Sequence, residues 1–361
     1  MTTGKRIQLL VPLLKKYPEL GIRHARDLQD WLRLELGSDR ALDDWQVYGG
    51  IKTRAVAPGT LYHVCAGNLP VSGFFSIVCG LLLGSRNVVK VPEGRGSEFR
   101  EFAGNLPLPL RRRVVLKLRF AERDLEAADA VIVFGRDETV ARIRRQVPWQ
   151  KPFLGYGHRA SLIWVARRHQ SAAGLARRCA YDASLYGQQG CLSPHAVYLE
   201  KGIDAEAFGA RMAEAMEKFG SEKLSLVEAA AIREARAAAR ARGEQVWESR
   251  GSLDWTVILS RHPQFQLSCL NRVIYLKQAS LAQLPRMLAP VKGHLSTVGL
   301  AGALNAAEEK AFGLVAAQRF CRAGAMQHPS VAWHHDGRPA LSDLVRWVDA
   351  EDFGLRNADC R

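Results

Sequence analysis

The sequence lacks the cysteine patterns that hold small secreted domains or zinc-binding domains together. Its seven cysteines are an odd number, and none of them forms a C-x-x-C pair. Neither a disulfide framework nor a zinc ribbon is therefore predicted, and a reducing, cytoplasmic setting fits best. Residues 1–6 carry charges with no long apolar run behind them, so we expect no signal peptide.

Nucleic-acid and membrane signatures are missing as well. The net charge is +15, from 51 Lys and Arg against 36 Asp and Glu, and such an excess attracts nucleic acid, acidic proteins or phosphorylated small molecules. No RNP-type aromatic motif or helix-turn-helix pattern accompanies the arginines, which we interpret mainly as solvated helix faces. The uncharged residues 64–85 are long enough for a membrane span. They include Asn68 and Pro70, however, so a buried helix is predicted instead.

Short β-branched runs alternate with helical patterns along most of the chain. Such alternation predicts βαβ units and a largely parallel sheet. At 361 residues, the chain is expected to form two lobes that divide near Tyr186. Strands are expected at residues 87–91, 114–120, 130–134, 161–165, 196–199, 255–259 and 272–276, and helices at residues 5–36, 138–146, 171–186, 204–219 and 224–242.

One cysteine stands in a glycine-rich turn between an expected helix and an expected strand. Residues 187–194 read Gly-Gln-Gln-Gly-Cys-Leu-Ser-Pro, which places Cys191 directly after Gly190. Glycine lets backbone N–H groups approach a reacting atom closely, and loops of this kind can favour the nucleophilic thiolate. The alternative is a small buried cysteine in a tight turn. This motif alone favours neither interpretation.

A second segment, residues 63–70, ends an apolar strand and opens the uncharged helix. Pro70 suits the first helical turn, and Gly84 suits the helix C-terminus. The N-terminus of such a helix offers N–H donors and a positive dipole to an anion. The Asn68 amide is therefore placed to stabilise a developing oxyanion. Alternatively, Asn68 only caps the helix.

Two further positions follow buried strands. Lys90 ends one expected strand, and Gly135 and Arg136 follow another. In a doubly wound sheet, ligands collect at the carboxyl ends of the strands, so Lys90 suits a phosphate or a ribose hydroxyl. A G-x-G-x-x-G fingerprint is missing here, and an ordinary Rossmann dehydrogenase is not predicted.

Taken in chain order, these motifs resemble the aldehyde dehydrogenase superfamily and, within it, the LuxC-like acyl-CoA reductases. Residues 155–161 and 333–337 also read like that branch. The resemblance extends from about Tyr62 to about Asp349. It implies an α/β, aldehyde dehydrogenase-like fold, with two doubly wound α/β lobes and the active site between them. The expected parts are an N-terminal helical segment (1–61), an NADP-binding lobe (62–186), a catalytic lobe (187–335) and a C-terminal tail (336–361).

The resemblance also implies the chemistry: NADPH-dependent reduction of an acyl thioester to an aldehyde through an acyl-cysteine. Cys191 would be the nucleophile, and Asn68 with the Cys191 backbone N–H would form the oxyanion hole. The implied cofactor-binding residues are Lys90 and Glu93 at the ribose, Gly135 and Arg136 near the phosphates, Lys90, Arg95 and Arg136 at a 2′-phosphate, and Gly155 and Gly157. The implied partners are acyl-CoA or an acyl carrier protein, an acyl-activating synthetase, and further copies of this chain in a homo-oligomer.

One departure from hydrolytic aldehyde dehydrogenases decides the direction of the implied reaction. Those enzymes carry a glutamate before a Leu-Gly-Gly turn as the base for the deacylating water. The matching position here is Phe153, and no acidic residue occurs between Glu138 and Asp182. Hydride or a thiol, not water, should then resolve the thioester. The alternatives are an acyl-phosphate reductase of the same fold and a non-catalytic basic scaffold or nucleic-acid binder.

Three other candidates weigh less. His334, His335 and Asp336 lack a third spaced ligand, so no metal site is predicted. His294 is a candidate proton donor to the aldehyde oxygen, with a structural histidine as the alternative. Cys65 lies in an expected strand and should be buried.

Overall fold

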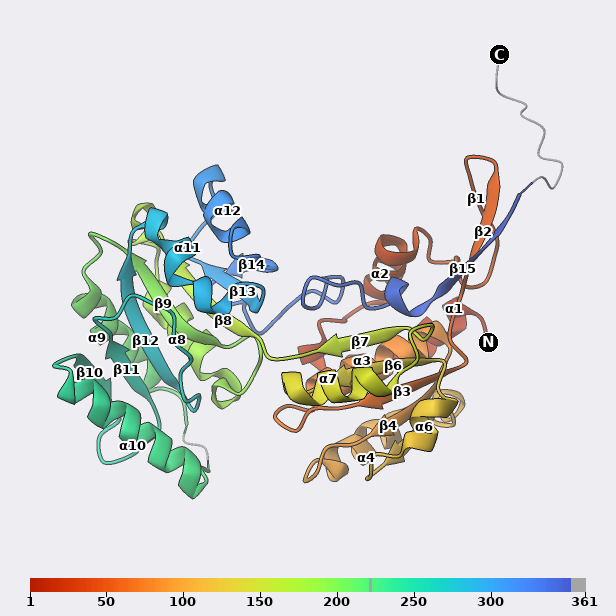
Figure 1. Ribbon diagram of the computed structural model, residues 1–361, viewed down its shortest axis with the longest axis horizontal. Coiled ribbons are helices and arrows are strands. Elements are labelled where there is room, and N and C mark those ends of the chain that lie inside the picture. The colour runs from red at the N-terminus through yellow and green to blue at the C-terminus, as the bar shows by residue number, and fades with distance from the viewer. Residues whose placement is uncertain (221–222, 352–361) are drawn as a thin grey trace, which may run out of the picture. The chain divides into compact units, whose positions relative to one another are not determined.

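The computed structural model describes residues 1–220 and 223–351 and divides the chain into two compact units (Figure 1). The first comprises Met1–Gly157 and His328–Arg361, and the second comprises His158–Gln327. The division falls earlier than the expected boundary near Tyr186. The reason is that the strand at Ala160–Val165 pairs with strands of the second unit. The expected tail likewise belongs to the first unit as far as it is described.

The main sheet of the first unit has five parallel strands in the order β5-β4-β3-β6-β7. Chain order therefore reverses between β3 and β6, and the carboxyl ends at such a switch point form the crevice where doubly wound sheets bind ligands. The strands are β3 (Thr60–Val64), β4 (Arg86–Lys90), β5 (Val114–Lys117), β6 (Ala130–Phe134) and β7 (Phe153–Tyr156).

The helix at Val71–Leu83, α3, is the buried helix that the uncharged run predicted. Residues 73–83 are all buried, and Phe74 stacks on Phe102 with ring centroids 4.4 Å apart. Gly84 ends the helix with a φ of 88°, a left-handed conformation that glycine adopts without steric cost. In residues 1–220 and 223–351, no helix is long and apolar enough to cross a membrane.

Six other α-helices lie in the described residues of this unit. The N-terminal segment is two helices rather than one, because Pro18 opens a short turn and Gly21 follows it with a φ of 70°. Arg6 on the first of them donates from Nε to the Leu82 carbonyl at 2.8 Å and so ties it to α3. The helices are α1 (Thr3–Leu14), α2 (Ala25–Leu36), α4 (Gly96–Asn105), α5 (Leu108–Arg111), α6 (Glu122–Ala127) and α7 (Asp137–Gln146).

A small antiparallel sheet that the sequence did not predict also belongs to the first unit. It joins β1 (Gln46–Tyr48), β2 (Ile51–Val56) and β15 (Arg346–Ala350). Arg346 on β15 pairs with Val56 on β2, so the sheet joins two segments that are far apart in the sequence. This pairing corrects the expectation of a separate tail from residue 336, although residues 352–361 of that tail lie outside the described residues.

The second unit is built on a seven-stranded sheet in the order β10-β11-β12-β9-β8-β13-β14. All neighbours are parallel except β10 with β11. Ser225 and Glu228 form a capping box at the start of α10. The strands are β8 (Ala160–Val165), β9 (Pro194–Glu200), β10 (Gln245–Glu248), β11 (Thr256–Leu259), β12 (Val273–Ala279), β13 (Leu295–Leu300) and β14 (Arg319–Arg322), and the helices are α8 (Leu175–Ser184), α9 (Ala205–Met216), α10 (Leu226–Ala241), α11 (Leu284–Met287) and α12 (Ala306–Gly313).

Candidate active site

The loop that carries Cys191 is held in an unusual backbone conformation. Tyr186, Gly187 and Gln188 have φ angles of 55°, 60° and 64°, so three consecutive residues are left-handed. This conformation costs a non-glycine residue about 1 kcal/mol or more. The buried Gln188 amide compensates by donating to the Pro194 and Val273 carbonyls at 2.8 and 3.0 Å. The turn before the cysteine is therefore fixed from inside the unit.

Other side chains fix the segment around the cysteine itself. The Ser161 hydroxyl on β8 donates to the Cys191 carbonyl at 3.1 Å. The Gln327 amide donates to the Ser193 hydroxyl at 2.6 Å. A Cβ on Gly190 would lie 2.9 Å from Oε1 of Gln327, so only glycine allows this approach without a shift. Cys191 is thus presented on a clamped loop.

Cys191 differs from the other cysteines in its exposure. Of the six cysteines in the described residues, it alone is exposed, and Cys360 lies outside them. Cys65 is buried, as expected, and burial raises its pKa to about 12. Burial also raises the pKa of Cys321 to about 11 and that of Cys269 above its ordinary value. At neutral pH these thiols stay protonated and are poor nucleophiles.

Asn68 lies in the loop between β3 and α3, in the first unit, and it is exposed. The residue that caps α3 is Pro70, so the N-cap alternative for Asn68 does not hold. Arg95 fixes this loop by donating to the carbonyls of Gly67 and Asn68 at 3.1 and 2.8 Å. Arg95 also pairs with Glu98 at 3.0 Å. These contacts give Arg95 a structural role in the Asn68 loop, and its expected contact with a 2′-phosphate stays a prediction.

Four expected cofactor-binding residues share the carboxyl edge of the first unit's sheet. Lys90 ends β4, and its carbonyl accepts from the Cys65 backbone at 3.2 Å, which brings the loop after β3 beside it. The exposed Glu93 follows within the same connection. Gly135 and Arg136 follow β6 on the other side of β3, and Arg136 precedes the first turn of α7. Lys90, Gly135 and Arg136 thus flank Asn68 around the switch point.

The two later glycines have different surroundings. Gly155 lies inside β7, and a Cβ there would come 2.6 Å from Cγ1 of Val140, so Gly155 serves strand–helix packing. Gly157 follows β7, and a Cβ there would collide with Oδ1 of Asp137. A carboxylate therefore lies beside Gly157, although the sequence has no acidic residue between Glu138 and Asp182. Asp137 reaches it from α7, whereas Phe153 packs under the Arg144 guanidinium, 5.3 Å from the ring centroid.

A buried histidine that sequence reasoning did not single out lies beneath the Asn68 loop. His63 on β3 is fully buried, with Nδ1 2.6 Å from the Ser76 hydroxyl and Nε2 2.9 Å from Oδ1 of Asn87. Burial lowers its pKa to about 4. Neutral His63 therefore joins β3, β4 and α3 directly below the loop. The spacing of these residues in the sequence gave no signal for the contact.

The structure adds no support for the remaining histidine candidates as a proton donor or as metal ligands. His294 is exposed, with Nδ1 3.3 Å from the His158 carbonyl. His335 packs against Tyr156, with ring centroids 4.6 Å apart, and His334 is exposed. Within the described parts of the chain, no group of three or more His, Cys, Asp or Glu side chains is arranged to hold a metal ion.

The chain resembles known proteins in sequence. The profile of the LuxC family, described as acyl-CoA reductase, matches residues 10–347. A long-chain acyl-protein thioester reductase from Aliivibrio fischeri is 28% identical over 184 residues, which cover 47% of this chain and 38% of that relative. The alignment therefore spans less than half of that protein. A relative of the same name from Photorhabdus laumondii is 22% identical over 342 residues, which cover 90% of this chain and 70% of the relative.

Solved structures match the fold over nearly the whole chain. A methylmalonate-semialdehyde dehydrogenase from Oceanimonas doudoroffii has a TM-score of 0.71 at 13% identity, covering 96% of this chain and 85% of its own. An aldehyde dehydrogenase from Mycobacterium tuberculosis, complexed with NAD+, also has a TM-score of 0.71, at 11% identity and with 98% and 86% coverage. The predicted aldehyde dehydrogenase-like α/β fold is confirmed.

Proposed function

Because this chain belongs to the LuxC family of acyl-CoA reductases, we propose that it reduces an acyl thioester to an aldehyde, with Cys191 as the acyl-accepting nucleophile. One observation carries the assignment to Cys191. It is the one exposed thiol among the described cysteines, and buried hydrogen bonds clamp its loop. A nucleophile needs both access to its substrate and a fixed position.

The chain's own residues supply two functions in this proposal, and the cofactor supplies a third. The Cys191 thiolate attacks the donor carbonyl, the acyl–Sγ bond forms, and the donor's thiol leaves. The Asn68 side-chain amide donates to the oxyanion that develops on the carbonyl oxygen. When bound, NADPH supplies the hydride that turns the acyl thioester into an aldehyde. Cys191 then regains its thiolate and is ready for a second acyl group.

The carboxyl edge of the first unit's sheet suits the dinucleotide. Lys90 and Arg136 offer cations on two sides of the switch point, and Glu93 offers a carboxylate for ribose hydroxyls. A Cβ on Gly135 would meet only the Thr139 side chain, at 3.5 Å, so backbone can approach a phosphate there. The proposed preference for NADPH rests on Lys90 and Arg136, because a cation beside the adenosine ribose suits the additional negative charge of a 2′-phosphate.

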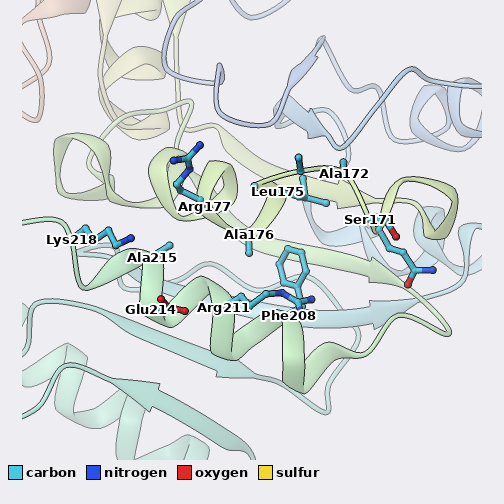
Figure 2. Close-up of a pocket in the computed structure, with 13 residues that line it drawn as sticks. Ser171, Ala172, Leu175, Ala176, Arg177, Phe208, Arg211, Glu214, Ala215 and Lys218 are labelled. Atoms are coloured by element: carbon cyan, nitrogen blue, oxygen red, sulfur yellow. The ribbon is translucent and has the colours of Figure 1, made fainter.

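A basic hollow on the second unit supports an acidic acyl donor. The hollow measures about 540 Å³ and lies between α8 and α9 (Figure 2). Arg177 lines it from α8, and Arg211 and Lys218 line it from α9 and the turn that follows, over an apolar floor that includes Phe208. Glu214 is the one acidic residue in its lining. We propose that this surface receives the acidic face of an acyl carrier protein.

Acylation without cofactor tests the central assignment. The purified chain is incubated with acyl-CoAs of increasing chain length, and intact mass spectrometry records the acyl adduct. Wild type should gain one acyl mass, which hydroxylamine removes, and Cys191→Ala should gain none. Cys269→Ala is the matched control and should acylate like wild type. An adduct that persists in Cys191→Ala would overturn the assignment of the nucleophile.

A further inference from the structure

Arg319, at the start of β14, is a partly buried cation beside the Cys191 loop that the proposed function does not use. Its Nη1 donates to the Met326 carbonyl at 2.8 Å and to the Thr297 hydroxyl at 3.4 Å. Its Nη2 donates to the Ala325 carbonyl at 3.2 Å. The guanidinium is therefore held between β13 and the segment that follows β14.

Hydrogen bonds link both of these neighbours to the Cys191 loop. On one side, the Thr297 backbone donates at 3.3 Å to the Ser161 hydroxyl, and that hydroxyl donates to the Cys191 carbonyl. On the other side, Gln327, next in the chain to Met326, donates to Ser193. Arg319 thus lies between two short chains of contacts that end on the residues around the nucleophile, all within the second unit.

The acidic groups near Arg319 differ in whether they are ionised at neutral pH. Burial lowers the pKa of Arg319, and the negative charges of Cys321, Asp182 and Cys191 raise it. Cys321 remains a neutral thiol at pH 7, because burial raises its pKa to about 11. Asp182 on α8 is fully buried and accepts from the backbone of Gly324 and Met326 at 2.5 and 3.1 Å. Of these three groups, Asp182 and the Cys191 thiolate can carry a negative charge near neutral pH. Burial raises the pKa of Asp182 to about 6, so its carboxyl is still largely ionised at pH 7.

We propose that Arg319 is a positioning residue that favours the thiolate form of Cys191 through its charge, with Asp182 as the competing anion. The inference deepens the proposed function and rests on Cys191 being its nucleophile. A nearby opposite charge stabilises a thiolate. Arg319 does not contact the acyl group in this proposal.

The pH dependence of alkylation of Cys191 tests the proposal without substrate or cofactor. Iodoacetamide reacts with the thiolate, and peptide-resolved mass spectrometry follows Cys191 separately from the other cysteines. Arg319→Met should move the midpoint of the alkylation profile upward and slow alkylation about tenfold at pH 7. Arg319→Lys keeps the charge and should restore most of the rate. Arg322→Met, at the exposed end of the same strand, is the matched control and should behave like wild type.

Asp182→Asn tests the same charge balance in the opposite direction. Removing the competing anion should move the Cys191 midpoint downward, a change that a loosened structure would not produce. Circular dichroism and thermal melting establish that each variant is folded. If Arg319→Met does not fold, the alkylation midpoints of Arg319→Lys and Asp182→Asn still test the proposal. The proposal is overturned if Asp182→Asn leaves the midpoint in place, or if folded Arg319→Met does. Because alkylation needs no acyl donor, a chain that fails to reduce thioesters but shows both shifts would sink only the proposed function.

Discussion

The amide of Gln327 donates a 2.6 Å hydrogen bond to the hydroxyl of Ser193, and both groups are buried. Gln327 is the last residue of the second unit, whereas Ser193 lies two positions after Cys191. The two residues are far apart in sequence and meet at the loop that carries Cys191. This bond joins the end of the second unit to that loop.

Gln327→Met keeps the approximate size of the side chain but removes its N–H donor. The buried Ser193 hydroxyl then loses the hydrogen bond that it accepts from Gln327. The loss of a buried hydrogen bond costs on the order of 1–3 kcal/mol, and the loop should lose its fixed geometry. We expect acylation of Cys191 to slow about tenfold or more, measured by quenched-flow mass spectrometry with an acyl-CoA. Ser193→Ala and the double variant complete a mutant cycle. Simple additivity of the three effects would show that the bond does not serve acylation.

Asn68→Ala should lower kcat and kcat/KM together by about two to three orders of magnitude, because an oxyanion donor acts on the transition state. The measurement is steady-state aldehyde formation at saturating NADPH. Since Pro70 caps α3, the change should leave the thermal melting temperature near that of wild type. Asn105→Ala, a substitution of an exposed asparagine at the end of α4, is the control. An effect on KM alone would contradict the oxyanion role.

The sequence predicted those parts of the molecule whose signals are local. An uncharged run between Pro70 and Gly84 predicted α3, and the glycine turn drew attention to Cys191. Arg319, Gln327 and Ser161 were not predicted, because each acts through partners on other segments of the chain. An arginine in a basic chain, or a serine in a strand, carries no sequence mark of the contact it makes. The antiparallel sheet was missed for the same reason: β2 and β15 lie near opposite ends of the chain.

Charge reversal in the basic hollow should affect a protein donor more than a small one. Arg211→Glu with Lys218→Glu turns two cations of the hollow into carboxylates, and repulsion of an acidic carrier should raise its KM about tenfold or more at low salt. The KM for acyl-CoA should change far less, and added salt should reduce the difference. Glu214→Lys is the opposite change and should lower the carrier's KM. Equal effects on both donors would remove the hollow as a carrier site.

Acid should destabilise the fold through two buried histidines. Burial lowers the pKa of both His63 and His195 to about 4, below the ordinary 6.5. Their stabilising contribution is complete above about pH 6.5 and is lost as the pH falls toward 4, by on the order of 3 kcal/mol for each histidine. Urea unfolding at pH 7, 5.5 and 4 measures this loss. His63→Gln should flatten the pH dependence, whereas the exposed His294→Gln should not change it.

The acyl-enzyme should resist water. The resemblance to aldehyde dehydrogenases implies that Phe153 stands where hydrolytic members carry their base, and its ring packs under Arg144. We therefore expect no base from that position. Asp137, which reaches Gly157 from α7, is the one acid whose place near this turn the sequence did not reveal. If Asp137 has only a structural role, acylated wild type and acylated Asp137→Asn should both release acid slowly without NADPH. Wild type should release aldehyde promptly when NADPH is added. Chromatography of the released acid and aldehyde separates the two paths. Acid release as fast as reduction would contradict the reductase proposal, and its loss in Asp137→Asn would identify Asp137 as the base of a hydrolytic aldehyde dehydrogenase.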